Sequence, residues 1–200
     1  MNRKIGMISS CITLISVILF ALFMILDMSS AAYSICILLS GGYITMAASH
    51  SCYVKKGYEA AKYTGMAFAV LYGVFVMLVY YAQITALVQG NLNEQAVYLI
   101  DYKKYGLYFA YDLFGYGMLA VSTFFIGLTI RPNSMEIKIL KNLMLIHGIF
   151  SVVCIIPVMN LFDAKMPAGD IIGIAILEVW CLYFSPICFL SYRYFKNQTS

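Results

Sequence analysis

Six long apolar stretches dominate this chain and restrict what it can fold into. Each is about 20 residues or longer, the length that a helix needs to cross the hydrocarbon core of a bilayer. The stretches cover residues 5–26, 30–49, 64–89, 106–130, 142–162 and 171–192. The gaps between them are too short for a soluble domain. The sequence therefore predicts a single domain over residues 1–200, an all-α polytopic membrane protein that forms a compact bundle of six transmembrane helices with short loops.

The composition favours a membrane protein over a soluble one. Of the 200 residues, 62% are hydrophobic and 11% are charged, against about 45–50% and about 25% in soluble domains. The lipid bilayer is therefore the expected partner of most of the surface. The net charge of +4 lies in short loops and forms no basic patch with interleaved aromatic residues, so we expect no nucleic-acid partner.

The distribution of lysine and arginine predicts the orientation in the membrane. Positive residues are retained on the cytoplasmic side. With the N-terminus inside, ten of the 13 positive residues fall inside, and the three outside are Lys103, Lys104 and Lys165. We expect a multi-pass protein of the cell membrane with cytoplasmic N- and C-termini.

Cysteines and histidines show no pattern typical of a metal or cofactor site. The six cysteines include no C-x-x-C pair, and five of them lie inside apolar stretches, where we interpret them as small packing residues. His50 and His147 have no companion Asp or Glu at ligand spacing. The sequence predicts no metal ion and no cofactor.

Two acidic residues, Asp112 and Glu178, lie inside apolar stretches. An ionisable side chain in a membrane helix is costly, faces the protein interior in most cases, and marks a candidate functional site. Both are six or seven residues from the outer end of their stretch. At a rise of about 1.5 Å per residue, both lie about 9–11 Å below the outer boundary. Gln83 lies on a stretch that runs in the opposite direction, six residues before its outer end at residue 89, and therefore has the same depth.

Helical phase, at about 100° per residue, indicates which side chains face inward. On the last stretch, we expect Glu178 to face inward, and Trp180 and Tyr183 to face lipid or another subunit. On the other helices, tyrosines fall close to the level of the two acids. The residues predicted to form one ligand-binding layer in the outer leaflet are Asp112, Glu178, Gln83, Tyr80, Tyr108 and Tyr116.

Such a layer suits a positively charged ligand. Two carboxyls in one pocket of low dielectric constant cannot both carry charge at low cost unless a cation enters. Tyrosine hydroxyls can orient the ligand, and tyrosine rings attract organic cations. A second interpretation stays open, in which a buried acid bonded to tyrosine only holds the helices together.

Two functional hypotheses follow. In the first, the chain is a bacterial inner-membrane protein that binds or transports a small cationic or amine-bearing ligand, with Asp112 and Glu178 as its anchors. In the second, it is a non-catalytic interaction protein, a regulator or immunity-type partner of another membrane protein, or a homo-oligomer. An intramembrane enzyme ranks third, because no nucleophile and base lie at reachable spacing.

Overall fold

The computed structural model describes residues 1–155 and 169–198, and the regular structure of this part is helical. The elements are α1 (Asn2–Ile25), α2 (Ser29–Ser51), α3 (Glu59–Ile84), α4 (Glu94–Ile100), the 3₁₀ helix η1 (Tyr102–Lys104), α5 (Leu107–Thr129), α6 (Met135–His147), α7 (Ile149–Ile155) and α8 (Gly169–Lys196). In the described residues, six segments are long and apolar enough to cross a membrane, with α6 and α7 together supplying the fifth. The predicted all-α bundle of six transmembrane helices is confirmed.

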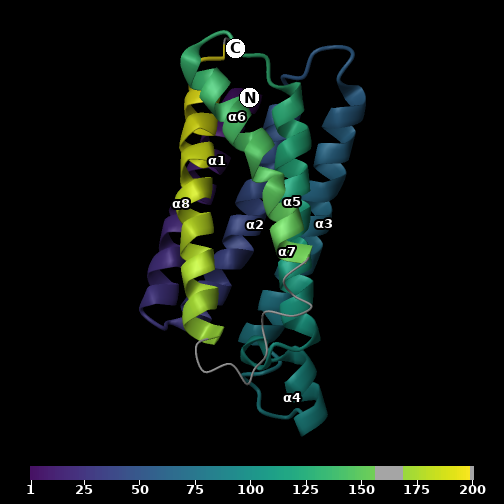
Figure 1. Cartoon of the computed structure of the whole chain (residues 1–200), viewed down its shortest axis with the longest axis vertical. Helices are drawn as coiled ribbons and strands as arrows, with labels where there is room; N and C mark the ends of the chain where they lie inside the picture. Colours follow the sequence, from purple (N-terminus) through teal and green to yellow (C-terminus); the bar gives the residue numbers. More distant parts are fainter. Residues whose placement is uncertain (156–168, 199–200) are drawn as a thin grey trace.

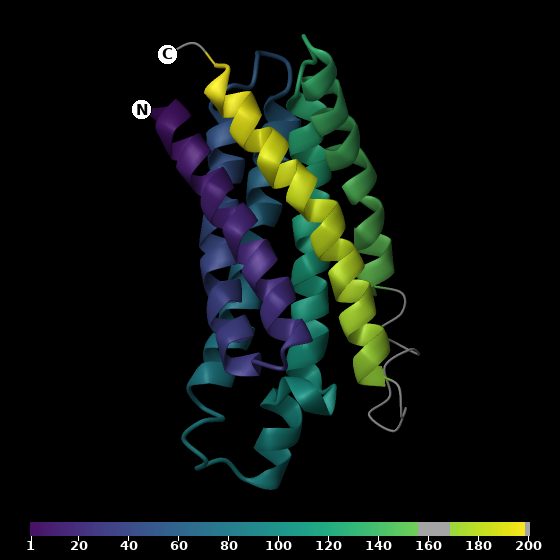
Figure 2. The same cartoon turned by 90° about the vertical axis from the view of Figure 1, so that its left-hand side faces the viewer.

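The six spans close into a ring. α1 packs between α2 and α8, α2 lies beside α3, and α3 pairs with α5. α5 contacts α6 and α7, and α6 completes the ring by contacting α8. Figures 1 and 2 show both termini at one end of the bundle and α4 at the other. Large buried side chains, among them Tyr43, Tyr72, Leu119 and Phe184, fill the middle of the ring.

The fifth span begins earlier than its apolar stretch. α6 starts at Met135 rather than near residue 142, because Ser134 caps its first turn and its Oγ accepts a hydrogen bond from the Ile137 amide at 3.3 Å. Lys138 and Lys141 lower the hydropathy of this first part, so a test based on apolar length misses it. The predicted end of the stretch, at residue 162, lies outside the described residues.

The same span is interrupted at Gly148, between α6 and α7. A Cβ atom at Gly148 would lie 3.0 Å from the Cβ of Phe124 on α5, so a larger residue would force the two helices apart. α6 packs on α8 toward the termini, whereas α7 and α8 separate toward the other end of the bundle, as Figure 1 shows. A cavity lies on that side of α5.

Polar side chains in the middle of the bundle are hydrogen-bonded to one another. The Tyr43 hydroxyl donates to Ser122 Oγ at 2.8 Å, and Ser122 Oγ donates to the Gly65 carbonyl at 2.7 Å. These bonds connect α2, α5 and α3. A buried hydroxyl without a partner is costly in a membrane interior, so this chain of bonds stabilises the mutual arrangement of the three helices.

Candidate functional site

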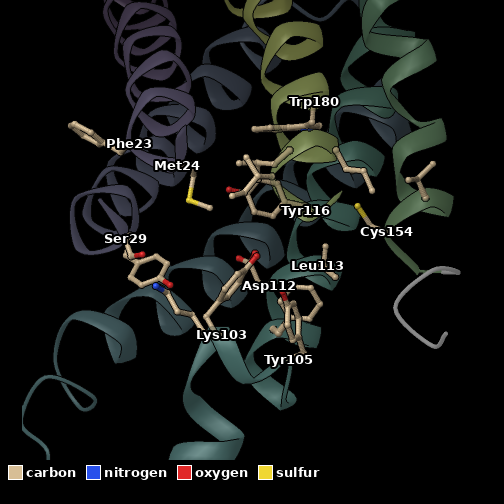
Figure 3. Close-up of a pocket in the computed structure, with 18 of the residues that line it drawn as sticks. Phe23, Met24, Ser29, Lys103, Tyr105, Asp112, Leu113, Tyr116, Cys154 and Trp180 are labelled. Carbon is tan, nitrogen blue, oxygen red and sulfur yellow. The ribbon is translucent and has the colours of Figure 1, made fainter. Parts of the chain in front are cut away.

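A cavity of about 560 Å³ lies at the end of the bundle away from the termini. Its walls come from the α1–α2 turn, η1, the first turns of α5, and the neighbouring parts of α7 and α8. Figure 3 shows Asp112 amid the lining side chains, with Tyr116 and Trp180 above it and Lys103 and Tyr105 below it in this view. The volume falls within the range of about 300–1,000 Å³ that is typical of small-molecule sites.

The carboxyl of Asp112 lies in the wall of this cavity. Asp112 is buried, with only 2% of its surface exposed. One carboxylate oxygen, Oδ2, accepts a hydrogen bond from the Tyr80 hydroxyl at 3.2 Å. The other oxygen, Oδ1, is buried and has no hydrogen-bond partner among the described residues. A buried acceptor without a donor costs free energy, so Oδ1 is the position at which a donor would be most favourable.

Gln83 lies outside the cavity lining and bonds to the backbone of the adjacent loop. Its side-chain amide donates to the Ile100 carbonyl at 2.7 Å, and its Oε1 accepts from the Tyr102 amide at 3.0 Å. Both bonds hold the end of α4 and the start of η1 against α3. Gln83 is therefore a residue that positions the loop.

The loop that Gln83 holds brings Tyr102 next to Asp112. Asp101 Oδ1 accepts a hydrogen bond from the Lys103 amide at 2.9 Å and caps η1. Burial, and then the charge of Asp112, raise the pKa of the Tyr102 hydroxyl well above its ordinary value. The phenol therefore stays protonated at neutral pH and lies beside the carboxyl.

Aromatic rings surround the carboxyl on two sides. Tyr33 stacks on Tyr80 with ring centroids 5.4 Å apart and lies 6.0 Å from Tyr102. On the deeper side, the Tyr116 ring meets Trp180 edge to face at 5.0 Å. Aromatic rings near a carboxylate favour a cation that approaches a ring face.

Trp180 and Tyr183 face the protein, so the prediction that they face lipid or another subunit was wrong. Only 7% of Trp180 is exposed, and its indole nitrogen donates to His147 Nε2 at 3.1 Å. The Tyr183 hydroxyl donates to the Leu143 carbonyl at 2.8 Å. The reason is the buried stripe of α8, in which Phe184 and Ile187 follow Trp180 at helical spacing.

Glu178 lies elsewhere on α8. It is two residues before Trp180, hence about 200° around the helix from it, and it is not among the residues that line the cavity. Glu178 is partly exposed, and its Oε1 has no hydrogen-bond partner among the described residues. The structure therefore does not bring Asp112 and Glu178 together in one pocket.

The remaining predicted site residues divide into two groups. Tyr116 lines the cavity, and Tyr80 bonds directly to Asp112. Tyr108 lies in the first turn of α5, partly exposed, with its ring 6.2 Å from that of Tyr111 and outside the cavity lining. Three lining residues that the sequence interpretation missed are Tyr33, Tyr102 and Trp180.

Two groups of cavity-lining residues, of different chemistry, are also exposed at the surface. At the loop end, the exposed side chains of Lys103 and Asp27 line it and form an ion pair with 3.8 Å between Nζ and Oδ1. On the side, Val153 of α7 and Ile176 of α8 line it and are 44% and 46% exposed. One exposed edge of the cavity is charged and the other is apolar.

Comparisons of the chain with protein-family models, with curated proteins and with solved structures gave no match. The function therefore has to be inferred from the chemistry of the chain's own residues.

Proposed function

We propose that this chain is a bacterial inner-membrane protein that binds or transports a small cationic ligand, such as a protonated amine, at Asp112. The observation that carries the proposal is the state of the Asp112 carboxyl. It is buried in the wall of a cavity, one oxygen bonds to Tyr80, and the other has no hydrogen-bond partner among the described residues. A cation satisfies that oxygen and offsets the cost of the buried charge.

The proposal has a single carboxyl anchor. Asp112 is the charged contact, with Tyr116 and Tyr102 beside the ligand and Tyr80 and Gln83 holding the anchor and the loop. Glu178 contributes no lining atom, so the hypothesis of two carboxyls sharing one ligand is replaced by this arrangement.

Orientation is part of the proposal. Lysine and arginine are in excess at the end of the bundle that holds the two termini, which favours a cytoplasmic N-terminus and C-terminus. The charged edge of the cavity at Lys103 and Asp27 then faces the opposite side of the membrane, and the cation enters from there.

A thermal-unfolding screen on the purified protein tests the proposal. The compounds are butylamine, tetramethylammonium and potassium as cations, with butanol and butyrate as uncharged and anionic controls. A compound that binds the folded state raises the unfolding temperature with its concentration. We expect stabilisation by at least one organic cation and none by butanol or butyrate.

Variants connect that stabilisation to the anchor. Asp112→Asn removes the charge with little change of shape. The matched control is Glu59→Gln, which removes an exposed charge at the first residue of α3, far from the cavity. The stabilisation should disappear in the first variant and persist in the second. If no cation stabilises the wild-type protein, and Asp112→Asn changes only its stability, the carboxyl is a structural contact and the interaction-protein hypothesis is favoured.

A further inference from the structure

We infer that the ligand is an amphiphilic amine, with a protonated N–H head at Asp112 and an apolar chain that leaves the cavity sideways between α7 and α8. This inference rests on the proposed function and names the class of ligand that the same cavity selects. Three features carry it: the free carboxylate oxygen, the apolar inner wall and the exposed apolar edge.

The free oxygen selects the head group. Oδ1 of Asp112 lacks a hydrogen-bond donor among the described residues. A primary or secondary ammonium supplies both a charge and an N–H donor, whereas a quaternary ammonium supplies only the charge. The aromatic rings nearby would accept either cation. The discrimination therefore comes from the unpartnered oxygen.

The inner wall selects the body of the ligand. Beyond Asp112, most of the lining side chains are apolar, among them Leu113 from α5, Phe150 from α7, and Leu177 from α8. A hydrophilic ammonium compound would leave these surfaces in contact with water or with empty space. An apolar chain covers them and gains free energy in proportion to the area removed from water.

The sideways route follows from the lining residues that are also exposed at the surface. Val153 and Ile176 both line the cavity and are substantially exposed on the outer surface of the bundle. They lie on α7 and α8, which diverge toward this end of the molecule, as Figure 1 shows. In a membrane, this surface faces hydrocarbon, so a chain longer than the cavity can continue into the bilayer.

Two sources supply this chemistry. One is a free long-chain amine, and the other is a membrane lipid with a primary ammonium in its head group. Both carry an N–H cation for Asp112 and an apolar chain for the edge at Val153 and Ile176. The two parts are joined directly in the amine and through a phosphodiester and glycerol in a phospholipid.

The single tryptophan provides the readout. Trp180 is the chain's only tryptophan, and it lines the cavity. Its fluorescence is measured in phosphatidylcholine nanodiscs during titration with decylamine, decyltrimethylammonium and ethanolamine. Decyltrimethylammonium matches the charge and chain length of protonated decylamine, and ethanolamine matches its head group.

We expect decylamine to produce a saturable change. Decyltrimethylammonium and ethanolamine should each bind at least about tenfold more weakly, which is the size expected for the loss of one hydrogen bond to a charged group or of a buried chain. Equal affinity for decylamine and decyltrimethylammonium would overturn the assignment of the head group. Equal affinity for decylamine and ethanolamine would overturn the assignment of the chain.

Two variants on one helix test the sideways route. Ile176→Phe enlarges a side chain at the apolar edge, and Val179→Phe enlarges an exposed side chain on α8 outside the cavity lining. The first should weaken decylamine several-fold more than butylamine, and the second should weaken neither. An equal effect of Ile176→Phe on both amines would contradict an exit at this edge.

Nanodiscs that also contain phosphatidylethanolamine distinguish the sources. If phosphatidylethanolamine competes with decylamine, the lipid head group is the ligand. If it does not compete, the ligand is a free amine. Either result supports the shared chemistry when decylamine itself binds as expected. If butylamine binds through Asp112 but decylamine gains nothing over it, only this inference fails. If no amine binds and no other cation stabilises the protein, the proposed function fails with it.

Discussion

The indole N–H of Trp180 donates a hydrogen bond to His147 Nε2 across 3.1 Å and joins α8 to the last turn of α6. As the acceptor at Nε2, the neutral His147 ring carries its hydrogen on Nδ1. Tyr183 stacks on the same imidazole with ring centroids 5.9 Å apart. Because Trp180 also lines the cavity, this contact connects the deep wall of the candidate site to the break between α6 and α7.

The first prediction concerns that contact. His147→Leu removes the acceptor and leaves a buried indole donor without a partner, so the free energy of unfolding should fall by about 1–2 kcal/mol. His147→Gln keeps a side-chain acceptor and should lose less. A double-mutant cycle with Trp180→Phe in detergent measures the coupling. Strictly additive effects would show that the Trp180–His147 hydrogen bond contributes nothing to stability.

The second prediction concerns the loop held by Gln83. In Gln83→Leu, the Tyr102 amide loses its acceptor and the Ile100 carbonyl loses its donor. Hydrogen exchange of the segment from Ile100 to Lys103 should accelerate, because local opening becomes less costly. Gln89→Leu changes an exposed glutamine near the same end of α3 and serves as the control. Unchanged exchange in Gln83→Leu would mean that other contacts hold η1 in place.

The third prediction concerns the spacing of α3 and α5. A Cβ at Gly115 would lie 2.8 Å from Val76 Cγ2, whereas a Cβ at Gly41 would meet only Met77 Cε at 3.8 Å. Gly115→Ala should therefore destabilise the protein by about 1–3 kcal/mol through overpacking, and Gly41→Ala should be tolerated. The measurement is thermal unfolding of both variants in the same detergent.

A second-site change checks the cause of the Gly115→Ala effect. Adding Val76→Ala removes the methyl group that the new Cβ would meet, so the double variant should recover part of the stability. If stability is not recovered, Gly115→Ala destabilises the protein through another contact, for example the Tyr80–Asp112 hydrogen bond one turn away.

The number and approximate position of the spans were predictable because apolar length alone identifies membrane helices. The inward face of α5 was also predictable at Asp112 and Tyr116, which are both buried. The start of α6 was missed, because the capping by Ser134 lies outside the apolar stretch.

The phase of α8 was not predictable in the same way. In a membrane protein, both lipid and interior favour apolar side chains, so hydropathy does not separate the two faces of a helix. Helical phase alone predicts Glu178 on the inner face, but the packing of Trp180 and Phe184 determines that face. Tyr102 was missed because it lies in a loop, and its position depends on the long-range bond to Gln83.

The central claim is that Asp112 alone anchors a cation. The most direct measurement is the dissociation constant of butylamine and decylamine, by isothermal titration calorimetry, for wild-type protein and for Asp112→Asn, Glu178→Gln and Glu59→Gln. We predict one saturable site in the wild type, binding at least about tenfold weaker in Asp112→Asn, and unchanged binding in the other two variants. Equal binding by the wild type and a folded Asp112→Asn protein would contradict the claim, and an equal loss in Glu178→Gln would restore the two-carboxyl hypothesis.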